Sequence, residues 1–514
     1  MAKNADIYFS LLKGLDLFYV DTVDFDNLIP TSMDKMLQSL DPYTVRISED
    51  AAGDFDFSTT GEYGGVGMLI RKRGQHAEIA ELYKGFPAQK AGVDVGDRIL
   101  AIDTINLQKK DITDVSNLLK GKIGSELSIK LLKYSTKDTV TVSVTRQKIH
   151  LPAVPYFGII ADTKIGYVYY STFTTNGSDE VKRAIVKLKE EGATSLILDL
   201  RNNTGGLLEE AVEVVNFFVP KGQNVVSIKG RGGKETDFKT KRSPVDVNIP
   251  LIVLINNMSA SSSEIVAGAL QDLDRAVIVG QKSFGKGLVQ SVVPLPFNQR
   301  LKMTTAKYYT PSGRCVQAIN YSHKNKADAK DSVQHRTFKT TNGRPVFDAG
   351  GITPDVALPR TKYAVLLQAL MEKDIIYDFA SRYYVGHPNK IDAATFTLSD
   401  ADYEDFISYS KISNFTYQTV EEQKFADFEK ALKARSDTAN FVSHITNIKT
   451  VLQQQKSDDL LTYRAEIQPF IEQEIVSRYD FQWGRIQTSI RYDKEIDEAV
   501  KLLKDKELYQ SKLK

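Results

Sequence analysis

Two short stretches near the middle of the sequence hold residue types that can carry out nucleophilic chemistry. Ser261 lies in the run SASSSEIVAGALQD, and Lys286 lies between the glycines of FGKG, 25 positions later. A serine hydroxyl attacks a carbonyl when a base takes its proton, and a lysine amine can be that base only while it is neutral. Burial lowers the pKa of a lysine, and the residues around Lys286 are largely apolar. The pair therefore predicts acyl transfer, with Ser261 as nucleophile and Lys286 as general base.

The surroundings of Ser261 predict a position that favours a developing negative charge. A continuous apolar run at 250–255 predicts a buried strand, and the spacing of the apolar residues after Ser261 predicts a helix. Unpaired N–H groups at a helix start favour negative charge. We therefore expect the N–H of Ser262 to be one oxyanion donor. The DLRNNTGG turn supplies the other, with Gly206 as the first candidate and Gly205 as the second.

Some alternatives stay open from the residues alone. Serine-rich turns are common helix caps, and the hydroxyls of Ser262 and Ser263 compete with Ser261 for the role of nucleophile. None of the six histidines lies in either stretch, so nothing supports a Ser-His-Asp triad. If Lys286 begins a strand, the side chain of Gln290 points to the same face of that strand. Its amide can then hold the lysine amine in position.

The elements that must position these residues follow a strand-helix alternation, which predicts an α/β core with a parallel sheet and right-handed crossovers. In the helical N-terminal part, Thr31 and Asp34 predict a helix start, and residues 50–61 predict a linker. The pattern along the chain predicts four regions: an N-terminal helical region (1–58), a strand-rich module (62–148), the α/β core (149–360) and a charged C-terminal helical region (361–514).

The strand-rich module has features that suit peptide binding. Its strand from Val66 to Lys72 offers an edge to which an extended peptide can add as a further strand. The run before this strand can present successive N–H groups to a terminal carboxylate, and it consists of Gly64, Gly65, Val66 and Gly67. The neighbouring helix predicts an apolar wall made of Val115, Leu118 and Leu119. A spacer that binds no ligand is the alternative for this module.

The three stretches SASSSEIVAGALQD, FGKG and DLRNNTGG together resemble the C-terminal processing peptidases, also called tail-specific proteases. The resemblance covers roughly residues 30–360 and implies a crotonase- or ClpP-like α/β protease core. It implies Ser261 as nucleophile, Lys286 as base and Gln290 as the supporting glutamine. The stretches EYGGVGMLI and GFPAQKAGVDVGDRILAID resemble a PDZ domain, which in this family captures the C-termini of unfolded or partly unfolded protein substrates.

Composition limits the partners that this chain is expected to have. The net charge of +2 gives no field that would attract nucleic acid or an anionic membrane, and no apolar run is long enough to span a bilayer. No cluster of metal-ligand residue types is found, so we expect no metal and no cofactor. The N-terminus lacks a secretory signal pattern, whereas the resemblance implies a periplasmic or cell-envelope enzyme whose signal has been trimmed. The expected partners are protein or peptide substrates with free C-termini. A regulatory protein and a homo-oligomer stay open.

Two other functions are weighed against a protease. A PDZ-bearing scaffold would bind peptides or other ligands on a protease-like core without cleaving them, but the joint presence of Ser261, Lys286 and Gln290 argues against it. An acyl-CoA-type enzyme would suit a crotonase-like core. The sequence shows no distinct CoA-binding signature, however, and such an enzyme would have no need for a PDZ module.

Overall fold

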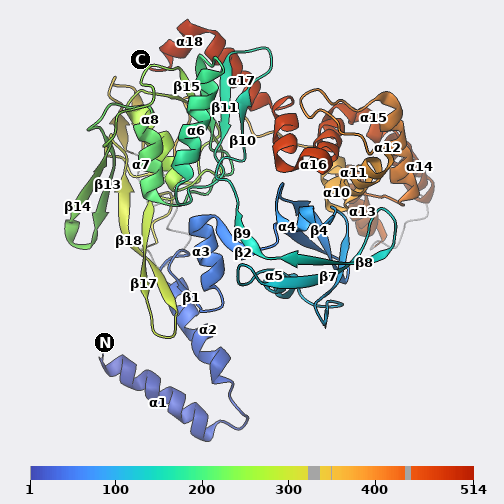
Figure 1. The fold of residues 1–514 in the computed structure, drawn as a ribbon, viewed down its shortest axis with the longest axis horizontal. Helices are drawn as coiled ribbons and strands as arrows, with labels where there is room; N and C mark the ends of the chain where they lie inside the picture. The colour runs from blue at the N-terminus through green and yellow to red at the C-terminus, as the bar shows by residue number, and fades with distance from the viewer. Residues whose placement is uncertain (1, 322–335, 349, 434–440) are drawn as a thin grey trace.

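The chain folds into an α/β core, a small strand-rich body and a helical region, and two N-terminal helices project from the core (Figure 1). The computed structural model describes residues 2–321, 336–348, 350–433 and 441–514. Within these ranges, no helix has the length and apolar character needed to cross a bilayer. The predicted mixed α/β architecture with a C-terminal helical region is confirmed.

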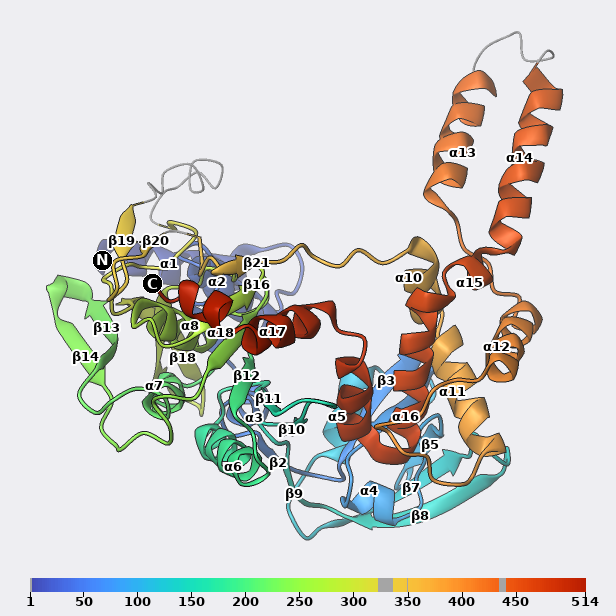
Figure 2. The same ribbon diagram turned by 90° about the horizontal axis from the view of Figure 1, so that it is seen from above.

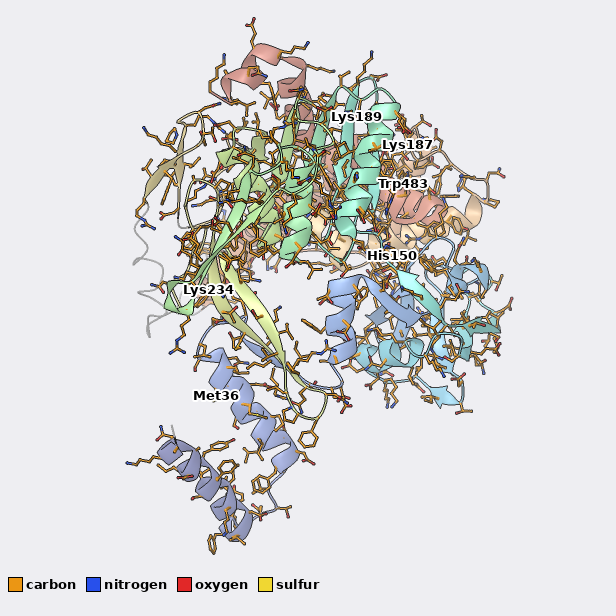
Figure 3. The ribbon with its side chains drawn as sticks, turned by 60° about the vertical axis from the view of Figure 1, so that its left-hand side comes forward. Met36, His150, Lys187, Lys189, Lys234 and Trp483 are labelled. Atoms are coloured by element: carbon orange, nitrogen blue, oxygen red, sulfur yellow. The ribbon has the colours of Figure 1, made fainter. Side chains whose placement is uncertain are left out.

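The projecting helices are α1 (Ala2–Phe18) and α2 (Phe25–Gln38), and neither buries a residue. Met36 stands exposed on this arm, as Figure 3 shows. The side chain of Asp24 caps α2 by accepting a backbone N–H at 3.1 Å. The predicted helix start at residues 31–34 is therefore wrong, because the Asp24 cap, about two turns earlier, begins the helix before them.

The segment predicted as a linker at 50–61 forms the helix α3 (Ala52–Thr60) instead. Its Asp, Ser and Thr content is typical of a loop, but Phe57 packs edge-on against the ring of Tyr63 with centroids 5.2 Å apart. Gly61 then ends the helix with a φ of 70°, a left-handed conformation that glycine adopts readily. Composition does not show this side-chain packing, so the linker prediction is wrong.

A six-stranded sheet forms the centre of the α/β core, and all its strands are parallel to their neighbours except the edge strand β10. In spatial order the strands are β10 (Tyr156–Ile159), β11 (Ile165–Tyr169), β12 (Ser195–Asp199), β15 (Leu251–Ile255), β16 (Val277–Gly280) and β21 (Val356–Ala357). The helices that pack on one face are α6 (Gly177–Glu190), α7 (Leu208–Asn216) and α8 (Ser262–Asp272). The predicted parallel sheet is confirmed.

The opposite face of this sheet is covered by the end of the chain. Helix α17 (Lys494–Lys504) packs on the buried side chains of β15 and β16, and α18 (Lys506–Ser511) follows it (Figure 2). The Tyr509 hydroxyl accepts a hydrogen bond from the N–H of Leu251 at 2.9 Å. A segment far along the chain therefore completes the core that carries Ser261.

A second, antiparallel sheet lies beside the first and receives the strand that follows Lys286. Its strands are β1 (Val45–Ile47), β13 (Asn224–Gly230), β14 (Glu235–Lys239), β17 (Leu288–Pro294) and β18 (Arg300–Tyr309), with the short helix η1 (Arg231–Gly233) between β13 and β14. A separate pair is formed by β19 (Thr337–Lys339) and β20 (Pro345–Phe347). Through β1, the N-terminal region adds a strand to β18 and so reaches the core.

The strand-rich body has the strand order β3-β4-β5-β7-β8, so that β3 is an edge strand, as predicted. Its elements are β2 (Glu62–Gly65), β3 (Met68–Arg73), β4 (His76–Leu82), α4 (Pro87–Lys90), β5 (Arg98–Ile102), β6 (Ile105–Asn106), α5 (Ile112–Leu119), β7 (Glu126–Leu132), β8 (Thr139–Thr145) and β9 (Gln147–His150). Strand β6 pairs with β5, and β2 pairs with β9.

The helical region packs against both other bodies. Its helices are α10 (Val365–Glu372), α11 (Ile375–Gly386), α12 (Asp400–Ile412), α13 (Val420–Lys433), α14 (Val442–Ser457), α15 (Asp459–Thr462) and α16 (Arg464–Ile490). Trp483 of α16 packs on Tyr156 of β10 with ring centroids 4.7 Å apart (Figure 3). Arg71 of β3 forms an ion pair with Asp374 at 2.6 Å. Helices α13 and α14 project as a hairpin (Figure 2).

Candidate active site

Ser261 stands at the turn between strand β15 and helix α8, as the sequence predicts. Its backbone has φ 57° and ψ −115°, a region that non-glycine residues rarely occupy. Such backbone strain clusters at functional sites, where surrounding contacts hold it in place. The side chain is half-buried. The fold therefore presents one partly accessible serine at the start of a buried helix.

The hydroxyls of the two following serines have structural partners. The Ser262 hydroxyl donates to the backbone oxygen of Gly206 at 2.9 Å, and the Ser263 hydroxyl donates to that of Asn203 at 2.8 Å. Both serines are fully buried. These bonds fasten α8 to the DLRNNTGG turn, and they leave Ser261 as the accessible hydroxyl of the three.

The double-glycine turn lies directly against Ser261. A Cβ atom at Gly205 would stand 2.8 Å from the Cβ of Ser261 and 2.9 Å from the backbone nitrogen of Ser262, so only glycine fits. The N–H of Gly205 donates to the side chain of Asn203 at 2.9 Å. In the described part of the chain, no hydrogen bond uses the N–H of Gly206 or Ser262. The turn therefore brings two unpaired N–H groups to the serine.

Glu264 joins the serine turn to the lysine loop, a role that the sequence alone did not predict. One oxygen of its fully buried carboxylate accepts from the N–H of Ser261 and from the N–H of Lys286, each at 2.9 Å. The other oxygen accepts from the Ser283 hydroxyl at 2.6 Å and from the Gly285 N–H at 2.7 Å. Desolvation raises the pKa of Glu264, and these hydrogen bonds oppose that rise. The spacing S-x-x-E, a capping pattern, was the available sequence signal.

The amine of Lys286 has an environment that favours its neutral form. Burial, followed by the like charge of Lys302, lowers the pKa of Lys286 to about 8, while Glu264 and Asp41 oppose the shift. The amine lies over the ring of Tyr43, 4.6 Å from the ring centroid. The ring quadrupole stabilises a cation, so this contact favours the charged amine and opposes the lowering of the pKa. Burial and the charge of Lys302 together account for the predicted lowering of the pKa of Lys286.

Tyr43 reaches this site from the turn before β1, and no local sequence pattern pointed to it. The Asp41 carboxylate accepts the backbone N–H groups of Tyr43 and Thr44, both at 2.8 Å. The Thr44 hydroxyl in turn accepts the N–H of Thr304 in β18 at 3.1 Å. The aromatic ring is therefore held over the amine of Lys286 by a turn that is fastened to the second sheet.

Gln290 lies near this network but in a different relation to Lys286 from the expected one. Strand β17 begins at Leu288, and its register shifts between Val289 and Gln290. The extra residue of this bulge, Thr305, belongs to β18, whereas Lys286 lies before β17, so the alternation along that strand does not set its side chain relative to Gln290. The Gln290 amide donates to the Thr304 hydroxyl at 3.3 Å.

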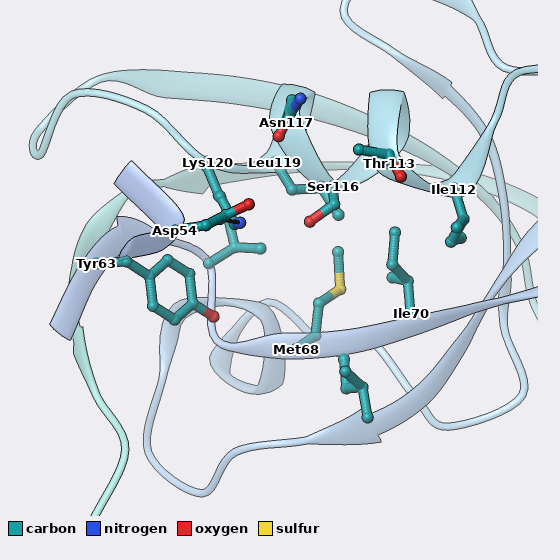
Figure 4. A pocket seen from close by; sticks show the side chains of 12 residues that line it. Asp54, Tyr63, Met68, Ile70, Ile112, Thr113, Ser116, Asn117, Leu119 and Lys120 are labelled. Atoms are coloured by element: carbon teal, nitrogen blue, oxygen red, sulfur yellow. Dashed lines mark hydrogen bonds and ion pairs between the residues drawn. The ribbon is translucent and has the colours of Figure 1, made fainter. Parts of the chain in front are cut away.

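A groove of about 320 Å³ opens between edge strand β3 and helix α5 (Figure 4). Of the residues predicted to bind a peptide, Val66 and Leu119 line it. The residues that line the groove are Asp54, Tyr63, Val66, Met68, Leu69, Ile70, Ile112, Thr113, Ser116, Asn117, Leu119 and Lys120. Most of them are apolar or uncharged, as in a groove that receives side chains of an extended peptide.

Several residues predicted for this groove lie elsewhere. Val115 is 1% exposed and packs inside the strand-rich body, and Leu118 packs against the same core. The helix face that meets β3 is instead formed by Ile112, Ser116 and Leu119. The sequence predicted an apolar helix wall without fixing which face of the helix forms it. Gly64 and Gly65 belong to β2, where they pair with Lys148 and Gln147 of β9 and so are part of a strand pair. Gly67 is not among the residues that line the groove.

Sequence comparison identifies the family. A model described as "Peptidase family S41" matches residues 164–323. A carboxy-terminal-processing protease of Bartonella bacilliformis is 37% identical over 308 residues, which cover 59% of this chain and 70% of the relative. The chain belongs to peptidase family S41. A second relative, a carboxyl-terminal-processing protease of Synechocystis sp., is 36% identical over 296 residues, covering 56% of this chain and 68% of the relative.

As an S41 peptidase, the protein is a serine endopeptidase of the carboxy-terminal-processing type. A model described as "PDZ domain" matches residues 78–133, so the strand-rich body is a PDZ domain. A model described as "Probable PDZ-protease, C-terminal helical domain" matches residues 366–503. This match corrects the expectation that the family resemblance ends near residue 360. The solved photosystem II D1 C-terminal processing protease is 29% identical, with 68% of this chain and 86% of that chain covered and a TM-score of 0.38.

Proposed function

We propose that this S41 peptidase cleaves peptide bonds with Ser261 as nucleophile and Lys286 as general base, through an acyl-enzyme intermediate. The observation that carries the proposal is the bridge made by Glu264, because one of its oxygens accepts the backbone N–H groups of both residues at 2.9 Å. Two loops separated in sequence are thereby held at one point. The low pKa of Lys286, about 8, supports its role as base.

In the proposed reaction, neutral Lys286 takes the hydroxyl proton of Ser261 as the oxygen attacks a peptide carbonyl. The N–H groups of Gly206 and Ser262 donate to the oxyanion, since neither is used elsewhere in the described residues. We leave Gly205 out of this role, because its N–H already donates to Asn203. Lys286 then returns the proton to the leaving amine and later activates the water that releases the acyl group.

The amine of Lys286 must move from the ring of Tyr43 to the Ser261 hydroxyl during this reaction, because within the described residues no hydrogen bond joins the two. A lysine side chain has enough rotatable bonds for such a movement. We assign Gln290 to the support of the amine in the active arrangement, in which its amide oxygen accepts from the amine while its amide nitrogen donates to the Thr304 hydroxyl.

We further propose that the PDZ domain selects substrates by their free C-termini. Edge strand β3 can pair with an extended tail, and the groove beside it has an apolar lining suited to alternate side chains. The substrates would be unfolded or partly unfolded proteins, since an extended tail and a cleavable segment must both be accessible. Location in the periplasm or cell envelope, a regulatory partner and a homo-oligomer stay predictions.

The test uses mass spectrometry of the products from an unstructured peptide, supplied with a free or an amidated C-terminus. Ser261→Ala and Lys286→Ala should each lower kcat/KM by about 10⁴-fold or more, because the nucleophile and the base act together and the loss of either one stops the reaction. The matched controls are Ser291→Ala and Lys282→Ala, which change exposed residues of the same region and should keep activity. Cleavage by Ser261→Ala at the wild-type rate would refute the assignment of Ser261 as nucleophile, whereas binding of the peptide without cleavage by the wild type would favour a scaffold.

A further inference from the structure

The PDZ groove contains one charged contact that comes from outside the PDZ domain. Asp54 belongs to helix α3, which precedes the domain in the chain, and yet its carboxylate lines the groove. Its oxygen Oδ1 forms an ion pair with the amine of Lys120 at 2.6 Å. Figure 4 shows the two side chains together at one end of the groove, beside Tyr63. Apart from Asp54 and Lys120, the residues that line the groove are uncharged, and the carboxylate of Asp54 lies at one end of the groove.

This end of the groove is where the chain offers N–H groups. Lys120 directly follows α5, and the next residue, Gly121, donates its N–H to the backbone oxygen of Gly64 at 3.0 Å. Lys120 is thereby held next to the turn that leads from β2 into β3. Within the described residues, the N–H groups of Val66 and Gly67 in that turn make no backbone hydrogen bond. Lys120 and Val66, whose N–H makes no backbone hydrogen bond among the described residues, therefore both line the groove.

We propose that Lys120 binds the α-carboxylate of a substrate tail, and that Asp54 occupies Lys120 while the groove is empty. The inference rests on the proposed binding of C-terminal tails by the PDZ domain. A peptide that adds to β3 with its C-terminus at the β2–β3 turn brings its carboxylate to Lys120, and its alternate side chains then face Met68 and Ile70.

The exposure of the ion pair suits an exchange of carboxylates. The side chain of Asp54 is 66% exposed and that of Lys120 is 35% exposed. Ion pairs in contact with water are weak, so the pair costs little to open. An incoming α-carboxylate can accept from Lys120 and from backbone N–H groups at once, and such charge-assisted bonds are stronger than those between neutral groups. Asp54 therefore competes with the tail without excluding it.

The experiment measures the Kd of a fluorescently labelled, unstructured peptide that ends in valine, as a free acid and as an amide, by anisotropy on the full chain carrying Ser261→Ala. Lys120→Gln should weaken binding of the free acid about tenfold and leave the amide unchanged, because only the acid carries the carboxylate. Asp54→Asn should tighten binding of the free acid about two- to fivefold, because the competing carboxylate is gone. Asp56→Asn, which changes another carboxylate of α3 outside the groove, is the matched control.

Both substitutions break the same ion pair, so a purely structural role would move both affinities in one direction. Opposite directions support the proposal. A free-acid preference that survives Lys120→Gln, or binding of the acid that is unchanged or weakened by Asp54→Asn, overturns it while tail recognition stands. Equal binding of acid and amide by the parent chain would instead overturn the proposed tail recognition, on which this inference depends.

Discussion

The pH dependence of cleavage is the sharpest test of Lys286 as the base. Burial and the charge of Lys302 lower the pKa of Lys286 to about 8, so the neutral, active fraction is about one hundredth at pH 6, about one tenth at pH 7 and about nine tenths at pH 9. Because only the neutral amine can accept the serine proton, kcat/KM should rise about tenfold per pH unit below pH 7. It should then level off above about pH 9.

The substitution Lys302→Met adds a perturbation of known sign to this profile. It removes a like charge that disfavours the protonated amine, so the pKa of Lys286 should rise and the ascending limb should move to higher pH. A shift of a few tenths of a unit corresponds to kcat/KM about two- to threefold lower at pH 7. Lys307→Met changes an exposed lysine of the same strand and should leave the profile in place.

The assay is kcat/KM for a quenched fluorescent peptide from pH 6 to 9.5 at constant ionic strength, with circular dichroism at each pH to follow folding. A profile without a rise, or a midpoint near pH 6.5 as for an unperturbed histidine, would show that Lys286 is not the titrating base. A shift to lower pH in Lys302→Met would refute the charge argument even if the lysine assignment held.

Three further outcomes follow from the contacts of the site. Glu264→Gln places an amide opposite four donors, so kcat/KM should fall about 100-fold and the free energy of unfolding by about 1–3 kcal/mol, measured by rate assays and urea titration. Gly205→Ala should lower the free energy of unfolding by at least about 2 kcal/mol more than Gly192→Ala. Both glycines have a positive φ, but of the two only Gly205 has atoms within 3 Å of the new Cβ. Equal losses of stability would contradict the steric argument. Tyr43→Leu should lower the midpoint of the pH profile by about half a unit to one unit, because the ring that stabilises the charged amine is lost. Tyr43→Phe keeps the ring and should leave the midpoint unchanged. Equal effects of the two substitutions would exclude the ring contact with Lys286.

Much of the core follows from local patterns in the sequence. The apolar run at 250–255 and the periodic helix after it place Ser261 at a strand-to-helix turn, and the structure has that turn at the same residues. These patterns are reliable because a strand buried on both faces and a helix packed on it each impose their own residue spacing. The strand expected to offer an edge to a peptide is an edge strand in the structure, as β3.

The predictions that failed depended on side-chain packing and strand pairing that composition and periodicity do not show. Residues 50–61 look like a linker by composition, but they fold as α3, and Phe57 of this helix packs on the ring of Tyr63. The condition that Lys286 begins a strand is not met, because β17 begins at Leu288, and the pairing of β17 with β18 that sets this start cannot be seen from alternation along one strand. The face of α5 that lines the groove likewise depends on the strand beside it.

The residue types, their order and the short elements that carry them were determined by the sequence itself: a serine at a helix start, a lysine in a glycine loop and a glycine run before a strand. Tertiary structure alone decided which groups surround them. Glu264 reaches the lysine loop, Tyr43 covers the amine of Lys286, and Asp54 meets Lys120 only because sheets and helices bring remote segments together. The pKa of a lysine and the availability of an N–H group depend on burial and on nearby charges, and these exist only in the folded chain.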